Sequence, residues 1–293
     1  MNPALRPALK APEILVAPGV YDAMTAAIAQ SAGFRAVYLS GAAVAYTRLG
    51  RPDIGLSTLS EMADTLMLIR DRIDLLVIID ADTGFGNALN AERTMRLYER
   101  AGASALQIED QTYPKRCGHL ADKTLVPAAE MAGKIAAMAD ARASDETLII
   151  ARTDAIAVEG IDAALDRAGR YLAAGADALF IEAPRSREEL CRVADTFRGR
   201  APLMANMVEG GETPITGAAD LEQIGFSLVI FPGGIVRALM RTAEDYYASL
   251  HATGSNAAFS GRMHDFKGLN DRLGTDEILR RGARFDPTFK AAE

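Results

Sequence analysis

The segment LLVIID, residues 75 to 80, decides the fold predicted for this chain of 293 residues. It is continuously apolar, rich in β-branched side chains, and ends in an aspartate. A short run of this kind is typical of a strand buried on both faces, as in a parallel sheet covered by helices. Seven similar runs occur elsewhere: EILVA (13–17), AVYLS (36–40), ALQIED (105–110), TLIIARTD (147–154), ALFIEAP (178–184), PLMANM (202–207) and LVIFPGG (228–234).

Amphipathic helical segments separate these runs. Examples are NAERTMRLYERAGA (90–103), AALDRAGRYLAAGADA (163–178) and SREELCRVADTFRG (186–199). Eight alternations of strand and helix predict an α/β fold of the (β/α)8 TIM-barrel type, with a doubly wound open sheet as the alternative. No G-x-G-x-x-G follows the first strand, which argues against nicotinamide binding. We expect one barrel domain over residues 1–293, with an amphipathic helical extension over about 252–293.

Composition limits the classes of partner. Apolar residues make up 49% of the chain and charged residues 24%, with a net charge of −7. These values are typical of a globular protein, and no apolar run is long enough for a membrane helix. Lys and Arg are scattered and form no basic stripe for nucleic acid. We expect a cytoplasmic protein without a targeting segment, two unpaired cysteines, and a small-molecule partner.

Polar residues follow the apolar runs where each predicted strand ends. In a barrel, the carboxyl ends of all strands meet at one rim, and that rim carries the active site. Some of these residues could instead cap the following helices. The candidates at this rim are Ser40, Gly41, Ala42, Asp80, Asp82, Glu109, Arg152, Glu182 and Asn206.

Carboxylates among these residues predict a metal site. Asp80 and Asp82 are two positions apart, which on a strand directs both side chains to one side. Asp53 and Glu109 would bring the number of carboxylates to four. Such a group needs a cation in a desolvated cleft, and oxygen ligands favour Mg²⁺, with Mn²⁺ as the alternative, over Zn²⁺. The competing interpretation is a set of solvated surface aspartates.

Arg152 and Cys117 are the candidates for chemistry on an anionic substrate. A guanidinium can bind a carboxylate or enolate through two hydrogen bonds, although Arg152 could instead pair with Glu182 or Asp154. Cys117 lies in KRCGH (115–119), beside cations that favour a reactive thiol. No Lys ends a predicted strand, which argues against a Schiff-base mechanism.

Several of these segments resemble one known family. YLSGAAVA (38–45), DADTGFGN (80–87), IEDQTYPKRCGHL (108–120), ARTDA (151–155), IEAP (181–184) and NMVEGGETP (206–214) are similar to motifs of the isocitrate lyase and phosphoenolpyruvate mutase superfamily. The resemblance implies a (β/α)8 barrel whose eighth helix is swapped between subunits of a homotetramer. The loop sequence K-[KR]-C-G-H is similar to that of the carbon–carbon lyases, whereas the mutases have K-x-N-S. The chain length favours the short branch, the 2-methylisocitrate and 2,3-dimethylmalate lyases.

The resemblance also implies roles for the candidate residues. Mg²⁺ would be held by Asp80 and Asp82, supported by Asp53 and Glu109. A 2-hydroxy acid would then undergo retro-aldol cleavage to pyruvate and a second carboxylate. Arg152, oriented by Glu182, would stabilise the developing charge, and Cys117 would donate the proton. Substrate contacts are implied for Tyr38, Ser40, Gly41, Ala42, Gly118 and His119. Asn206, Thr213 and Arg237 could hold a second carboxylate of the substrate.

One position bears on the choice of substrate. Val208, in ANMVEGG (205–211), stands where the methylisocitrate enzymes resemble ANITEFG and offer a hydroxyl. Loss of that hydrogen bond favours a substrate with a methyl group there, such as 2,3-dimethylmalate. The alternatives are an oxaloacetate hydrolase or decarboxylase, a carboxyphosphonoenolpyruvate mutase, and a barrel that only binds a small acid or a protein partner.

Overall fold

The computed structural model describes residues 4–118, 122–214, 217–286 and 288. The chain divides into two compact units, residues 1–236 and 237–293, and each is considered by itself. The extension predicted from about residue 252 falls within the second unit.

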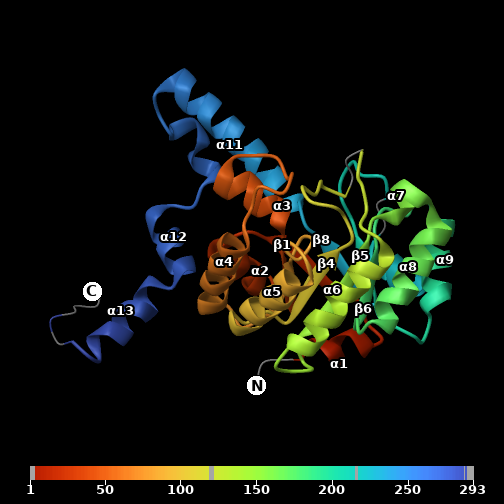
Figure 1. The fold of residues 1–293 in the computed structure, drawn as a ribbon. Coiled ribbons are helices and arrows are strands. Elements are labelled where there is room, and N and C mark those ends of the chain that lie inside the picture. Colours follow the sequence, from red (N-terminus) through yellow and green to blue (C-terminus); the bar gives the residue numbers. More distant parts are fainter. Residues whose placement is uncertain (1–3, 119–121, 215–216, 287, 289–293) are drawn as a thin grey trace. The chain divides into compact units, whose positions relative to one another are not determined.

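The first unit contains a closed barrel of eight parallel strands in sequence order, with β1 paired to β8 (Figure 1). The predicted (β/α)8 barrel is therefore confirmed. Each predicted apolar run contributes one strand. The strands are β1 (Leu15–Val20), β2 (Ala36–Leu39), β3 (Leu76–Asp80), β4 (Ala105–Glu109), β5 (Leu148–Thr153), β6 (Ala178–Ile181), β7 (Leu203–Asn206) and β8 (Leu228–Phe231).

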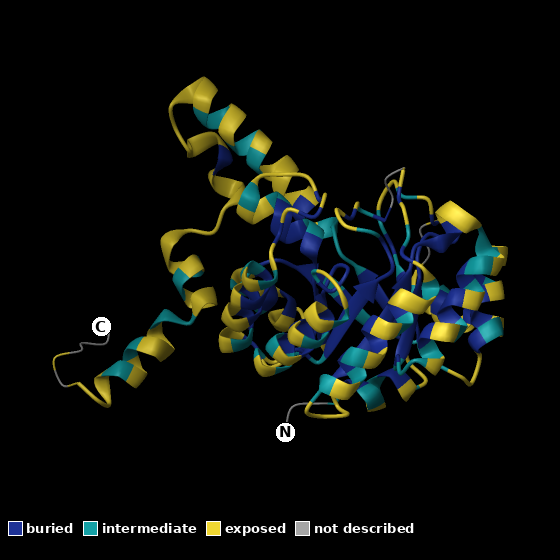
Figure 2. Cartoon of the chain, viewed as in Figure 1, coloured by how far each residue is buried: buried dark blue, intermediate teal, exposed yellow. Residues whose placement is uncertain are grey.

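Both faces of the strands are buried, which explains why the runs are continuously apolar (Figure 2). Along β3, Ile78 belongs to the cluster inside the barrel, whereas Val77 and Ile79 pack in the cluster beneath the surrounding helices. Leu5 and Leu9 of the short helix α1 (Leu5–Lys10) join the interior cluster. Helix α1 thus closes the end of the barrel opposite the carboxyl ends of the strands.

Helices follow the strands around the barrel. Several begin at side-chain caps: Thr58 accepts a hydrogen bond from the Glu61 amide, and Asp22 accepts one from the Thr25 amide. The remaining helices of this unit are α2 (Ala23–Ser31), α3 (Gly41–Val44), the π-helical turn η1 (Ala45–Leu49), α4 (Leu59–Arg72), α5 (Ala88–Arg100), α6 (Ala128–Ala141), α7 (Ala155–Glu159), α8 (Ile161–Ala173), α9 (Arg187–Phe197) and α10 (Ala218–Ile224).

The second unit is helical. Helix α11 (Gly234–Thr253) begins in the first unit and is followed by the 3₁₀ segment η2 (Ala257–Arg262), α12 (Phe266–Leu273) and α13 (Thr275–Ala283). The ring of Phe259 in η2 packs edge-on against Tyr246 of α11. Helices α12 and α13 have no buried residue, and Phe266 is 86% exposed. In the described part of the chain, no helix has the length and apolar composition needed to cross a bilayer.

Candidate active site

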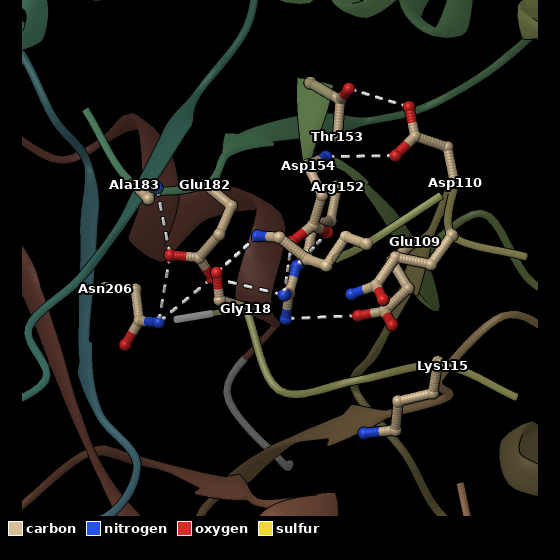
Figure 3. A network of polar contacts seen from close by, with 12 residues as sticks. Glu109, Asp110, Lys115, Gly118, Arg152, Thr153, Asp154, Glu182, Ala183 and Asn206 are labelled. Atoms are coloured by element: carbon tan, nitrogen blue, oxygen red, sulfur yellow. Dashed lines mark hydrogen bonds and ion pairs between the residues drawn. The ribbon is translucent and has the colours of Figure 1, made fainter. Parts of the chain in front are cut away.

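The carboxyl ends of neighbouring strands bring the predicted polar residues into one buried region (Figure 3). Asp80 ends β3, Glu109 ends β4, and Asn206 ends β7. Arg152 lies one residue before the end of β5, and Glu182 follows β6 directly. Buried carboxylates at strand ends need partners, and the hydrogen bonds and ion pairs of this region supply them.

Asp80 and Asp82 converge on the helix start that follows β2. A Cβ atom on Gly41 would lie 3.0 Å from Asp80 Oδ2 and 3.5 Å from Asp82 Oδ1, so glycine lets the backbone approach both carboxylates. Strand β3 ends at Asp80, and Asp82 has a φ of 46°, so a turn and not strand alternation brings the second carboxylate round. Ser40 accepts a hydrogen bond from the Ala43 amide and caps α3.

Lys115 lies between two of the predicted metal-binding carboxylates. Its Nζ is 2.6 Å from Asp53 Oδ1 and 2.7 Å from Asp82 Oδ1, and the residue is only 3% exposed. Burial would lower the pKa of Lys115, but Asp82 and Asp53 outweigh it and hold that pKa well above its usual value. The amine is therefore a fixed positive charge within this group of carboxylates.

The same charges set the protonation of Asp82. Burial, with smaller contributions from Asp80 and Asp53, raises the pKa of Asp82 to about 7 against the opposing effect of Lys115. The pKa of Glu109 is also raised well above its usual value, chiefly by burial, with Arg152 opposing the rise. A proton would therefore compete with a bound cation for Asp82 and Glu109.

Arg152 is held by three carboxylates. Its Nε and Nη2 donate to Asp154 at 2.9 Å each, Nη1 lies 3.1 Å from Glu109 Oε2, and Nη2 lies 3.4 Å from Glu182 Oε2 (Figure 3). The ring of Phe180 lies beneath the guanidinium at 5.2 Å. Both ion pairs expected as the alternative role of Arg152 are thus present. They hold the guanidinium in one orientation, which suits it to bind a planar anion.

The loop after β4 carries Cys117 to this region. The Cys117 amide donates to the Asp53 carbonyl at 3.3 Å, and the thiol-bearing residue is half-buried. At Gly118 a Cβ would lie 2.8 Å from Glu182 Oε2 and closer still to Arg152 Nη2. The loop therefore lies directly against the arginine at the end of β5, and only glycine fits at position 118. His119, the next candidate, lies outside the described residues.

Asn206 and Thr213 border a small cavity of about 10 Å³ beside Glu182. Asn206 Nδ2 donates to Glu182 Oε2 at 3.1 Å. Asn206 Oδ1 and Thr213 Oγ1 are buried and find no hydrogen-bond partner among the described residues. Asn206 Oδ1 could accept a hydrogen bond from a polar group of a substrate, and the Thr213 hydroxyl could accept or donate one.

Tyr38 and Arg237 are the two remaining candidates. Tyr38 is buried inside the barrel, where its hydroxyl donates to Gln107 Oε1 at 2.5 Å. Burial raises the pKa of Tyr38 well above its usual value, so the hydroxyl stays a donor. Arg237 is an exposed residue of α11 and belongs to the second unit.

The donor chemistry suits a hard cation. No cluster of three or more His, Cys, Asp or Glu side chains in the described ranges has the arrangement of a formed metal site. The available donors are nevertheless carboxylate oxygens that converge beside Gly41, and Glu109 Oε1 is buried with no hydrogen-bond partner in the part of the chain that the structure describes. Oxygen-only ligation is what Mg²⁺ prefers, so Asp80 and Asp82 fit such an ion.

Sequence reasoning missed Lys115 and Lys123. Each lies on the loop after β4, away from any strand end, yet each is buried and paired with a carboxylate of the site. The signal for Lys115 was its position as the first residue of KRCGH. No pattern in the sequence singled out Lys123.

Comparison with known proteins now identifies the family. Residues 5–251 match the family described as phosphoenolpyruvate phosphomutase. The chain belongs to this family. The resemblance expected from the motifs is therefore confirmed.

The relatives include two lyases. The chain is 42% identical to the 2,3-dimethylmalate lyase of Eubacterium barkeri over 95% of its own length and 96% of that protein. It is 43% identical to the 2-methylisocitrate lyase of Aeropyrum pernix over 95% of its own length and 89% of that protein. The expected class of enzyme, a carbon–carbon lyase, agrees with both names.

Solved structures of the superfamily share the fold. A 2,3-dimethylmalate lyase superposes with a TM-score of 0.91 at 36% identity, covering 96% of this chain and 93% of that one. An oxaloacetate acetylhydrolase gives 0.90 at 29% identity, covering 97% of each chain. A phosphonopyruvate hydrolase in complex with oxalate and Mg²⁺ gives 0.87 at 30% identity, covering 97% and 98%.

Proposed function

We propose that this protein is a Mg²⁺-dependent lyase that cleaves a 2-hydroxy dicarboxylic or tricarboxylic acid to pyruvate and a second carboxylate. The observation that carries the proposal is the approach of Gly118 to Arg152 and Glu182. It brings the loop of Cys117 to the one arginine that the carboxylates hold at the strand ends. A charge-binding group and a thiol proton donor are what cleavage to an enolate requires.

The metal would be held by Asp80 and Asp82, with Asp53 and Glu109 in support. Magnesium bound there would supply Lewis-acid polarisation of the hydroxyl or keto oxygen on the substrate. Support comes from the convergence of Asp80 and Asp82 beside Gly41 and from the Mg²⁺ in the related hydrolase. Lys115 already balances part of the negative charge, so the ion and the amine share the same carboxylates.

The chain's own residues perform the remaining steps. Backbone amides of Gly41 and Ala42 would bind the substrate carboxylate, since the start of α3 faces Asp80. A carboxylate of the site, such as Glu109 with its raised pKa, would take the hydroxyl proton. The bond between C2 and C3 then breaks, and C2 becomes the carbonyl of pyruvate. The electron pair passes to C3 as an enolate, which Arg152 stabilises in the orientation fixed by Asp154 and Glu182. Cys117 then gives its proton to C3.

The distal part of the substrate would lie near Asn206 and Thr213. Their partnerless oxygens can bind one polar group. His119 and Arg237 stay proposed contacts of the same substrate. Val208 offers no hydrogen bond, and a site lacking a partner for a charged group disfavours that group. Val208 therefore favours 2,3-dimethylmalate over 2-methylisocitrate, whereas identities of 42% and 43% to the two kinds of lyase do not distinguish these substrates.

A pyruvate-release assay tests the proposal. The protein with Mg²⁺ is offered 2,3-dimethylmalate, 2-methylisocitrate, isocitrate and oxaloacetate in parallel. Preferred turnover of dimethylmalate is the expected result, and preferred turnover of methylisocitrate would show that other groups bind the distal carboxylate. Oxalate and acetate are measured in parallel, because hydrolysis of oxaloacetate releases these two acids and no pyruvate. Their formation from oxaloacetate alone would support the second candidate, a hydrolase, which the similarity to an oxaloacetate acetylhydrolase favours.

The exposed second unit supports assembly. Apolar side chains of α12 and α13, among them Phe266 and Ile278, are 86% and 51% exposed. Burial of such a face against other copies would stabilise a homotetramer, and the superfamily resemblance implies that form with the eighth helix swapped. Light scattering on the purified protein gives the mass, and a monomer would contradict the proposal. A cytoplasmic location stays a prediction, which cell fractionation tests.

A further inference from the structure

Lys123 is a buried lysine that the reaction proposed above does not use. Its side chain is 2% exposed. The ammonium donates to Asp154 Oδ1 at 2.9 Å and to the carbonyl oxygen of Gly118. A buried ammonium costs desolvation, so both of its partners must be well placed. The amine thus joins the loop that carries Cys117 to the end of β5.

Asp154 is a fixed anchor for this lysine. Its carboxylate accepts two hydrogen bonds from Arg152, and its backbone amide donates to Asp110 Oδ1 at 3.0 Å. Burial opposes ionisation, but Arg152 and Lys123 more than offset it and lower the pKa of Asp154 to about 2. Asp154 is therefore a permanent anion, and Lys123 has a strong partner at any working pH.

Asp110 in turn fixes the position of Asp154. It accepts a hydrogen bond from Thr153 Oγ1 at 2.7 Å, drawn in Figure 3, and another from the Tyr171 hydroxyl, also at 2.7 Å. The position of the anchor is thus set by β4, β5 and α8. The position of Gly118 depends on the loop itself.

Further contacts of the loop are made by the residues that precede Gly118. Gln111 brackets Arg116, accepting from its amide at 2.9 Å and donating to its carbonyl at 2.8 Å. The Cys117 amide reaches the Asp53 carbonyl at 3.3 Å, which is long for such a bond. Lys123 instead contacts Gly118, the residue after Cys117, and holds the Gly118 carbonyl near Asp154 and Arg152.

We propose that Lys123 is a positioning residue that fastens the Gly118 carbonyl to Asp154 and so holds the thiol of Cys117 at the active site. This inference rests on the proposed function for the role of Cys117, but the fastening itself can be measured without turnover. A lysine that served only the fold would not change the exposure of one thiol.

The rate at which iodoacetamide alkylates Cys117 measures how firmly Lys123 holds this part of the loop. The wild type and Lys123→Met are treated in parallel, and mass spectrometry follows the peptides of Cys117 and Cys191 separately. Loss of one charge-assisted hydrogen bond to the loop should speed alkylation of Cys117 by about tenfold. The alkylation rate of Cys191, on α9, should stay within about twofold of the wild-type rate, since the described contacts of Lys123 are with Asp154 and Gly118. Lys123→Arg, which keeps the charge and the donors, should restore most of the protection.

Lys134→Met is the matched control. Lys134 is another buried lysine of the same unit, and it donates to the Thr83 carbonyl at 3.2 Å. Its substitution should leave the alkylation rate of Cys117 near that of the wild type. Equal alkylation of Cys117 in folded Lys123→Met and in the wild type would overturn the proposal, as would an equal acceleration in Lys134→Met. If Lys123→Met does not fold, Lys123→Gln replaces it with the same two outcomes.

The two proposals fail separately. A wild type that releases no pyruvate from any tested acid overturns the proposed function, whereas the alkylation comparison still decides the role of Lys123. If turnover is found, Lys123→Met should lower kcat by about tenfold or more, because the thiol is then misplaced for proton transfer.

Discussion

Arg152 and Asp154 are joined by two parallel hydrogen bonds, Nε to Oδ2 and Nη2 to Oδ1, each 2.9 Å long. The two residues flank the last residue of β5, so the end of a barrel strand itself fixes the plane of the guanidinium. The remaining nitrogen, Nη1, is directed to Glu109. An arginine held in this way loses little freedom when it binds an anion.

Replacement of Arg152 by lysine should therefore be far from conservative. A single ammonium cannot form the paired bonds to Asp154 and also stabilise charge on an enolate. We expect kcat for pyruvate release to fall by about 100-fold or more. Arg192→Lys, an exposed arginine on α9, serves as control and should keep the wild-type rate. Similar rates for the two variants would exclude charge stabilisation by Arg152.

Cys117→Ala should abolish most turnover while the protein stays folded. A general acid contributes about 10² to 10⁴ in rate, and the half-buried thiol contributes little packing. Steady-state pyruvate release and the melting temperature are measured on the same preparation. Cys191→Ala is the matched control. Full activity of Cys117→Ala would remove the thiol from the proton-transfer step.

Lys115→Met should make the protein depend on Mg²⁺ for stability. Without the amine, Asp53 and Asp82 lose the cation that lies 2.6 and 2.7 Å from their oxygens. Breaking a buried ion pair on one side costs about 3–5 kcal/mol, which urea unfolding in EDTA would detect. Mg²⁺ should then raise the melting temperature more in this variant than in the wild type. An equal rise in both would mean that the ion does not use these carboxylates.

Metal-free stability should depend on pH through Asp82. The pKa of this residue is about 7 in the folded protein, above its usual value of 3.8. A raised carboxyl pKa means that the folded state binds the proton more tightly than the unfolded state. Its stabilising contribution is complete below about pH 4 and is lost as the pH rises to about 7.

Asp82→Asn gives the comparison for this pH effect, because asparagine does not titrate. In EDTA, the melting temperature of the variant minus that of the wild type should grow from pH 5 to 7 and then level off. A change of at least about 1 kcal/mol, or roughly 2 °C, is expected. Added Mg²⁺ should reverse the trend in the wild type, since the ion binds the ionised form. A constant difference across this range would contradict the raised pKa.

The barrel could be predicted from sequence because all eight strands are buried on both faces. LLVIID and its counterparts had to be continuously apolar to pack against the interior and the helices at once. The strand-end residues could then be predicted from the barrel itself, because a parallel barrel places the carboxyl ends of its strands at one rim.

The charge partners of these residues could not be predicted in the same way. Lys115 and Lys123 come from a loop whose path depends on contacts far apart in sequence, such as Tyr113 with the Gly55 carbonyl. Strand alternation predicted that Asp82 would point to the same side as Asp80. Its carboxylate does lie beside that of Asp80, but a turn with positive φ after the end of β3 brings it there. The periodicity of a sequence describes strands and helices, and it carries no such signal for loops.

Helix α1 has a consequence for how substrate enters the site and how products leave it. Side chains, Leu5 and Leu9 of α1 among them, fill the interior of the barrel, so small molecules do not pass through it and would reach the strand ends from the rim side. Two fragments arise from each cleavage, and the one nearer the mouth must depart first. The inner fragment then still occupies the place of the next substrate, so it should act as a competitive inhibitor.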